Sequence, residues 1–275
     1  MAQKIAKLII DGVIEDENET YRQTWILETI DKLSRKKNIA GIILYIDSPG
    51  GCVYETDEVY ETLLKYKKET QKPVYAYLSS VAASGGYYIA CAADKIIANR
   101  NSITGSIGVI AGKFIDLSEF MKKHGIKGEI IHAGRNKTIG DPAKPLNEEQ
   151  RKIMQSIADE CYEQFTEIVG SARKLDINKV KELADGRIYT AKQAKDLGLI
   201  DEISAFDNAV KIFNQDVFGD CEYESDVKEY KMKPKKTLMK MLKGETNADL
   251  LQNIVTEMFG IRKLKFPAFY SDFKK

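Results

Sequence analysis

The stretch SSVAASGGYYIACAAD, from Ser79 to Asp94, follows the apolar run KPVYAYL. This order predicts a strand, a tight turn and a helix that begins near Ser84. The Ser84 hydroxyl would then lie beside helix N–H groups that lack a partner and favour an oxyanion. Gly85 and Gly86 have no Cβ, so a carbonyl group could approach the backbone closely. An N-cap serine followed by two packing glycines is the alternative interpretation of this stretch.

A second glycine turn, DSPGG at residues 47–51, follows the apolar run AGIILYI. It too precedes a helical pattern, so its N–H groups could face an anion, although by itself it indicates only a turn. The carboxyl ends of neighbouring parallel strands are where α/β sheets bind ligands. We therefore expect the two turns to hold one carbonyl oxygen together.

Outward from these turns, short β-branched runs alternate with amphipathic stretches. IAKLIIDG precedes a helical pattern near residues 20–36, and Val59, Leu63 and Tyr66 form the apolar stripe of a second helix. Strand runs that are apolar on both faces are typical of a buried parallel sheet. The pattern predicts an α/β fold with a mostly parallel sheet, βαβ crossovers and a helical C-terminal part.

Later segments carry weaker signals. We expect strands at DKIIANR and GEIIHAG, a helix from about Asp116 with Glu119 in a capping box, and a long helix capped by Asn147 and Gln150. The compact domain is predicted to span residues 1–214. Residues 215–275, which include KMKPKKTLMKMLKG, are predicted to form a basic C-terminal extension that is solvated or contacts another subunit.

Composition excludes several classes of function. The 275 residues carry a formal net charge of +1, which gives no field that would attract nucleic acid. Four cysteines without a Cys-x-x-Cys pair and only two histidines make a metal site unexpected. No apolar run approaches the roughly 18 residues that span a bilayer, and no signal-peptide layout is present. The chain as written is therefore expected to be soluble, although a chain cut free of an anchor would read the same.

A nucleophilic serine needs a base, because its hydroxyl is protonated at neutral pH. His132 lies within the strand expected at GEIIHAG, and Lys137 lies in the polar loop that follows it. A lysine can act as a base where burial disfavours its charged form. Both candidates remain open from the residues alone.

Five segments resemble the signal peptide peptidase A family in order and spacing: DSPGG, AASGGYYIACAAD, ITGSIGVI, GRNKTIGDP and DGRIYTAKQAKDLGLIDEI. The resemblance spans about residues 5–212. It implies a serine peptidase with a Ser–Lys dyad on a crotonase-like, Clp-protease-like fold. By that resemblance Ser84 is the nucleophile, Lys137 the general base, Ser106 the hydrogen-bond partner of the lysine, and Gly51 and Gly85 the oxyanion-hole amides. No metal or organic cofactor is implied.

The resemblance further implies cleavage of residual signal peptides or other unfolded segments after small or apolar residues. It implies a homo-oligomer, with an octamer as one expected size. Family members usually carry an N-terminal membrane anchor, whereas this chain begins almost at the first strand, which leaves membrane contact and compartment open. The alternatives are a crotonase-like enzyme acting on acyl-coenzyme A and a non-catalytic oligomeric scaffold. A stomatin-cleaving relative is a closer rival, but ASGGYY follows the signal peptide peptidase pattern.

Overall fold

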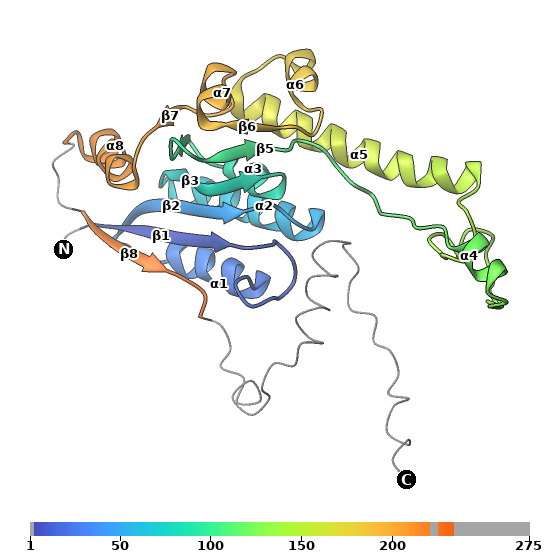
Figure 1. Cartoon of the computed structure of the whole chain (residues 1–275). Coiled ribbons are helices and arrows are strands. Elements are labelled where there is room, and N and C mark those ends of the chain that lie inside the picture. The colour runs from blue at the N-terminus through green and yellow to red at the C-terminus, as the bar shows by residue number, and fades with distance from the viewer. Residues whose placement is uncertain (1–2, 221–224, 234–275) are drawn as a thin grey trace, which may run out of the picture. The chain divides into compact units, whose positions relative to one another are not determined.

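The structure, a computed structural model, describes residues 3–220 and 225–233 (Figure 1). The strands are β1 Lys4–Asp11, β2 Ile39–Ser48, β3 Val74–Ala83, β4 Lys95–Ala98, β5 Ile103–Gly105, β6 Ile188–Thr190, β7 Glu202–Ile203 and β8 Asp226–Tyr230. The helices are α1 Gln23–Ser34, α2 Val53–Thr70, α3 Gly85–Ala90, α4 Ser118–Lys123, α5 Glu148–Arg173, α6 Ile177–Leu183, α7 Ala191–Asp196 and α8 Phe206–Phe218.

The chain divides into two compact units. The first unit consists of residues 3–111, 146–220 and 225–233, and the second of residues 112–145. Of the elements above, only α4 belongs to the second unit. In the described part of the chain, no helix is both long and apolar enough to cross a bilayer.

The first unit is built on an eight-stranded sheet with the order β6-β5-β3-β2-β1-β8, and β4 bridges β3 and β7 off this path. Every pairing is parallel except that of β5 with β6. Helices α1 and α2 are the crossovers that join β1 to β2 and β2 to β3. The predicted α/β class with a mostly parallel sheet and βαβ crossovers is confirmed, and the fold is Clp-protease-like.

Alternate residues of the central strands enter two different cores. Leu8 and Leu44 belong to the larger cluster, which also holds buried side chains of α1, α2 and α3. Ile5 and Ile43 belong to a smaller cluster with Phe213 of α8. Because successive strand residues point to opposite faces, this division places α8 on the face of the sheet opposite to α1, α2 and α3.

β3 carries a bulge close to its end. Its pairing with β2 advances from Ile46↔Leu78 to Ser48↔Ala82, so β3 holds two more residues than β2 over this interval. The Asp47 carboxylate accepts a hydrogen bond from the Val81 N–H at 3.2 Å within the bulge. Before the bulge β3 pairs with β4, and after it with β5. Because of the bulge, β3 pairs with two neighbouring strands, first β4 and then β5. Ser106, one of the predicted site residues, directly follows β5.

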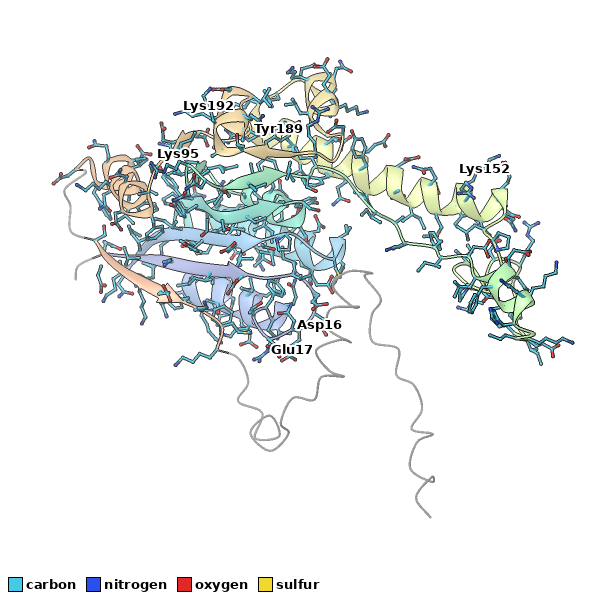
Figure 2. All side chains as sticks on the ribbon, viewed as in Figure 1. Asp16, Glu17, Lys95, Lys152, Tyr189 and Lys192 are labelled. Carbon is cyan, nitrogen blue, oxygen red and sulfur yellow. The ribbon has the colours of Figure 1, made fainter. Side chains whose placement is uncertain are left out.

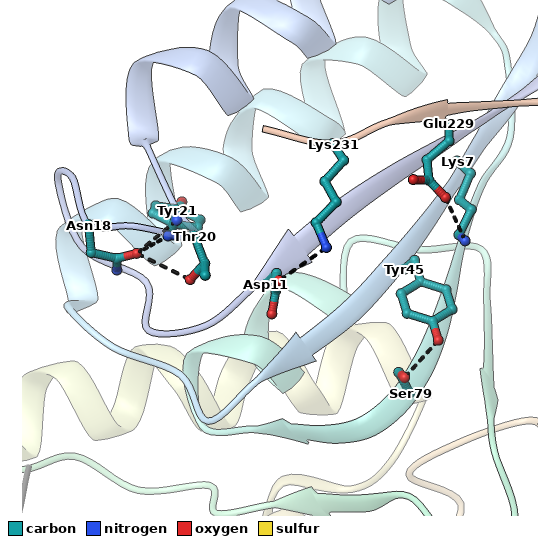
Figure 3. Close-up of polar contacts among 9 residues, drawn as sticks. All are labelled: Lys7, Asp11, Asn18, Thr20, Tyr21, Tyr45, Ser79, Glu229 and Lys231. Atoms are coloured by element: carbon teal, nitrogen blue, oxygen red, sulfur yellow. Dashed lines mark hydrogen bonds and ion pairs between the residues drawn. The ribbon is translucent and has the colours of Figure 1, made fainter. Parts of the chain in front are cut away.

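The sheet continues past Asn214, where the sequence places the end of the compact domain. Helix α8 runs to Phe218, and β8 adds a parallel strand beside β1. The Lys7 ammonium contacts the Glu229 carboxylate at 3.0 Å, and Lys231 contacts Asp11 at 3.5 Å (Figure 3). Most of the predicted extension, including PKKTLMKMLKG at residues 234–244, lies outside the described residues.

The second unit departs from the sequence prediction in two ways. Residues 128–134 form no strand, so the strand predicted at GEIIHAG is wrong. The capping box predicted with Glu119 is also absent: Leu117 is the N-cap, and Asp116 accepts a hydrogen bond from the Ser118 N–H at 2.9 Å. No residue from 112 to 145 is buried. An apolar run forms a strand only where a neighbour supplies the backbone partners, and within these residues none does.

Candidate active site

A pocket of about 490 Å³ opens in the first unit. Gly51, Ser84, Gly85 and Ser106 all line it, so the structure brings together four of the residues that the sequence selected. Lys137 belongs to the second unit. The residues that line the pocket therefore include the predicted nucleophile and the predicted oxyanion-hole residues. The predicted base is not among them.

Ser84 alone joins β3 to α3. Its φ of 52° and ψ of −121° lie in a left-handed region that a residue with a Cβ adopts at a cost. The backbone holds it there at both ends: its N–H donates to the Gly105 carbonyl at 2.8 Å, and its carbonyl accepts from the Tyr88 N–H at 2.9 Å. A strained strand-to-helix turn is a common means of exposing a nucleophilic serine. The prediction that a helix begins near Ser84 is confirmed: Ser84 is the N-cap residue of α3, although its side chain caps nothing, contrary to the alternative interpretation as a capping serine.

The backbone amides of Gly51 and Gly85 lie next to each other in this pocket. A Cβ built on Gly85 would lie 3.3 Å from the Gly51 nitrogen. Neither N–H donates a hydrogen bond within the described part of the chain. Two adjacent amides without a partner beside a serine form the arrangement that stabilises a tetrahedral oxyanion.

The two glycine turns are in direct contact, and this contact requires glycine. Gly50 has φ of +99°, and a Cβ there would lie 2.6 Å from the Gly85 nitrogen and 2.8 Å from the Ser84 Cβ. A Cβ on Gly51 would lie 1.9 Å from the Ile14 carbonyl oxygen, because Ile14 and Gly51 form a β-bridge. The DSPGG turn therefore packs tightly against the Ser84 turn on one side. On the other side it packs against Ile14, which lies shortly after β1.

Ser106 directly follows β5 as Ser84 directly follows β3. The two strands pair through Ala83↔Gly105, so the two serines occupy equivalent places at neighbouring strand ends. Ser106 also has positive φ, 51°, and its N–H donates to the Arg187 carbonyl at 2.7 Å. On β6, Tyr189 (Figure 2) covers Gly105, where a Cβ would lie 2.6 Å from its ring. The segment DGRIYT thus supports the backbone at Ser106.

The two candidate bases both lie in the second unit. Lys137 is exposed, and its N–H donates to the Gly134 carbonyl at 3.0 Å in a turn. His132 is exposed as well, and its Nδ1 lies 3.2 Å from the same carbonyl oxygen. Neither unit by itself contains both a serine of the pocket and a predicted base.

The pocket walls include aromatic residues that the sequence analysis did not select. Tyr88 comes from α3, and Tyr162 and Phe165 come from the long helix α5. Burial, followed by the hydrogen bond to Asp57, raises the pKa of Tyr88 above its usual range, so the phenol stays protonated. Aromatic residues at helical spacing are typical of any core-facing stripe, so the sequence carried no signal that these face a cavity.

No group of three or more histidine, cysteine, aspartate or glutamate residues in the described ranges is arranged to bind a metal ion. The pocket offers hydroxyl groups, backbone amides and apolar walls. These groups suit nucleophilic attack on a carbonyl and stabilisation of the resulting oxyanion.

The sequence matches Peptidase family S49 over residues 66–217 and the Clp protease family over residues 6–119. It is 37% identical over 215 residues to an Enterococcus faecium protein named for signal peptide peptidase SppA, a match that covers 76% of this chain and 62% of that protein. A Synechocystis protein whose name describes a protease is 38% identical over 207 residues, covering 75% of this chain and 72% of its own length.

A third relative, the chloroplastic serine protease SPPA of Arabidopsis thaliana, is 32% identical over 243 residues. That match covers 87% of this chain and 34% of the plant protein. The matched region thus spans less than two thirds of the Enterococcus and Arabidopsis relatives.

Proposed function

The chain belongs to peptidase family S49, and on that premise we propose that it hydrolyses peptide bonds with Ser84 as nucleophile and Lys137 as general base. One observation carries the proposal: Ser84 lies on a strained strand-to-helix turn, in a pocket where two adjacent amides have no hydrogen-bond partner among the described residues. Such a turn costs conformational energy, and strain of this kind gathers where function requires it.

In the first step, a neutral Lys137 amine accepts the Ser84 proton while Oγ attacks the peptide carbonyl carbon. The carbonyl oxygen becomes an oxyanion that the Gly51 and Gly85 N–H groups stabilise, and one such donor is typically worth about 3 kcal/mol. The lysine then gives its proton to the leaving amine as the C–N bond breaks. The products of this step are an acyl ester on Ser84 and the released C-terminal fragment.

In the second step, the lysine takes a proton from water, which attacks the ester through the same oxyanion arrangement. The ester C–O bond breaks, the proton on the lysine returns to Ser84 Oγ, and the N-terminal fragment leaves as a carboxylic acid that gives its remaining proton to solvent. Ser106 would accept a hydrogen bond from the lysine amine and hold it in line. No metal or organic cofactor takes part in this scheme.

We propose that the substrates are unfolded segments, with residual signal peptides as one class, cut after small or apolar residues. The apolar walls of the pocket support this choice, because Val53, Tyr88 and Phe165 offer contact surface rather than charge.

We also propose that the working enzyme is a homo-oligomer, with an octamer as one candidate size. A lysine acts as a base only where burial disfavours its ammonium form, yet Lys137 is exposed in the single chain. Seven large apolar side chains of the second unit are exposed as well: Phe114, Ile115, Leu117, Phe120, Ile126, Ile130 and Ile131. A second copy that covers this unit would bury both the apolar side chains and the lysine.

The direct test is hydrolysis of an unfolded protein such as reduced casein, with cleavage positions read by mass spectrometry. We expect wild type to cut after small or apolar residues and Ser84→Ala to leave the substrate intact. Hydrolysis of an acyl-coenzyme A thioester without peptide cleavage would favour the crotonase-like alternative. A correctly assembled chain inactive on both substrates would favour the scaffold.

A further inference from the structure

Three polar side chains from three helices meet behind the wall of the pocket. The Tyr88 hydroxyl on α3 donates a hydrogen bond to Asp57 Oδ1 on α2 at 2.5 Å. The Gln164 amide on α5 donates to the same Oδ1 at 3.0 Å and to the Tyr88 oxygen at 2.7 Å. Because Gln164 acts as a donor to Tyr88, Asp57 is the acceptor for the phenolic proton among the described residues.

Tyr88 lines the same pocket as the proposed nucleophile Ser84. Its N–H donates to the Ser84 carbonyl, which places the side chain one helical turn after Ser84. The residue is 4% exposed and lines the pocket, and its ring packs on Phe165 with centroids 4.9 Å apart and edge-on to Tyr60 at 5.3 Å. Tyr88 is therefore part of the wall that limits the space available to a substrate side chain in the pocket of Ser84.

We propose that Asp57 is a positioning residue that fixes the Tyr88 ring and, through it, limits the size of the substrate side chain accepted just before the cleaved bond. This inference rests on the proposed function, since it assigns part of the same pocket. Asp57 does not itself line the pocket, whereas its neighbour Thr56 does. Its effect on a substrate must therefore pass through Tyr88.

Asp57 fixes the Tyr88 ring because leaving the Tyr88 hydroxyl without an acceptor costs free energy. A buried donor that loses its acceptor loses a hydrogen bond to a charged group and keeps its desolvation penalty. Without Asp57, the Tyr88 ring lowers its free energy by turning its hydroxyl towards another acceptor or towards water. That movement changes the wall of the pocket, and we expect it to admit larger side chains.

The experiment compares two peptides that differ only in alanine or leucine before the cleaved bond. The readout is the ratio of kcat/KM for the leucine peptide to that for the alanine peptide. We expect Asp57→Ala and Tyr88→Phe each to raise this ratio at least about fivefold, a change within the range that one or a few methylenes control. Because Asp57 acts through the hydroxyl, the double variant should match Tyr88→Phe alone.

Two further variants separate this role from general stability. Asp57→Asn keeps an oxygen acceptor and should return the ratio to within about twofold of wild type, because the acceptor matters more here than the charge. Glu69→Ala removes another carboxylate of α2, one that is remote from the pocket lining, and should leave the ratio unchanged.

An unchanged ratio in folded Tyr88→Phe would overturn the inference even if Asp57→Ala fails to fold, because the phenylalanine keeps the ring. A further shift on adding Asp57→Ala to Tyr88→Phe would also overturn it. Either result would leave the proposed function standing, since wild type would still cut the alanine peptide. A wild type that cuts neither peptide nor casein would remove the proposed function and this inference with it.

Discussion

The surroundings of Ser84 and of Lys137 are built in different ways. Ser84 lies between the ends of two paired strands, in a unit where β1, β2 and β3 contribute buried residues to two cores. Lys137 lies in residues 112–145, none of which is buried. The difference teaches that the first unit by itself holds the proposed nucleophile in a fixed backbone geometry, whereas the second unit by itself leaves the proposed base exposed.

Removing the base should produce the largest effect. We expect Lys137→Ala to lower kcat by about 10³-fold or more, because a neutral serine hydroxyl then has no group to take its proton. Because Lys137 is exposed in the single chain, the circular dichroism spectrum of Lys137→Ala should match that of wild type. Lys144→Ala, an exposed lysine of the same unit, is the matched control and should keep wild-type turnover. Full activity in Lys137→Ala would show that Lys137 is not the general base.

The second prediction concerns the proposed contact between the second unit and a second copy of the chain. Ile131 is 95% exposed in the single chain, and Ile131→Asp should lower the oligomer mass measured by light scattering and lower turnover about 100-fold. A charge in the centre of an apolar contact loses its hydration without gaining a partner. Val13→Asp, a change at a 47% exposed residue of the first unit, should alter neither mass nor turnover. A monomeric wild type with full activity would contradict the proposed assembly.

The third prediction concerns Ser106, which the structure places at a strand end equivalent to that of Ser84. We expect Ser106→Ala to lower kcat by about 10-fold, less than the loss of the base, because a positioning group does not itself take the proton. KM should change little, since the hydroxyl is proposed to contact the lysine rather than the substrate. Equal losses in Ser106→Ala and Lys137→Ala would contradict this division of roles.

The fourth prediction changes stability in the first unit while leaving turnover intact. The Arg173 side chain, 9% exposed, donates to both oxygens of Asp201 at 3.0 and 2.7 Å and to the Gly198 carbonyl at 2.9 Å. Arg173 is buried but the Asp201 side chain is 36% exposed, so solvent screens the charge pair, and Arg173→Met should cost about 1–2 kcal/mol in urea unfolding at pH 7, mainly through the lost hydrogen bonds. Folded Arg173→Met should turn over as wild type, since Arg173 does not line the pocket.

The pH dependence of this pair follows from Asp201. Burial raises the pKa of Asp201, but hydrogen bonds from Arg173 and from the Ile96 N–H outweigh it and hold the pKa below its usual value. The stabilisation is present above the unfolded pKa of about 3.9 and is lost as the pH falls through the lower folded pKa. The difference between wild type and Arg173→Met should therefore shrink below about pH 4. Lys192→Met, at an exposed ion pair, should cost under about 1 kcal/mol at any pH.

The features that the sequence predicted correctly are those with a local signal. Apolar runs such as AGIILYI and the glycine turns around Gly51 and Ser84 carry local signals, because burial on both faces and positive-φ geometry restrict which residues fit. The Asn147–Gln150 capping box is confirmed for the same local reason. Four of the predicted site residues accordingly meet in one pocket.

The missed features depend on partners distant in the sequence. β8 reads DVKEY, without strand-like alternation, and contacts β1 through charged side chains such as Lys7 and Glu229. GEIIHAG has a strand-like composition but no neighbouring strand within residues 112–145. Tyr88 and Asp57 meet only because α2 and α3 pack together. Such relations follow from the tertiary fold and leave no mark in the local pattern.

The central claim is that Ser84 is activated by Lys137, and the most direct measurement is labelling with a serine-directed fluorophosphonate. The assembled wild type, Ser84→Ala and Lys137→Ala would be compared by intact mass and peptide mapping at equal probe concentration. The account predicts one label per chain on Ser84 in wild type and none in either variant. Labelling of Ser84 at the wild-type rate in Lys137→Ala, or labelling only at another residue, would contradict it.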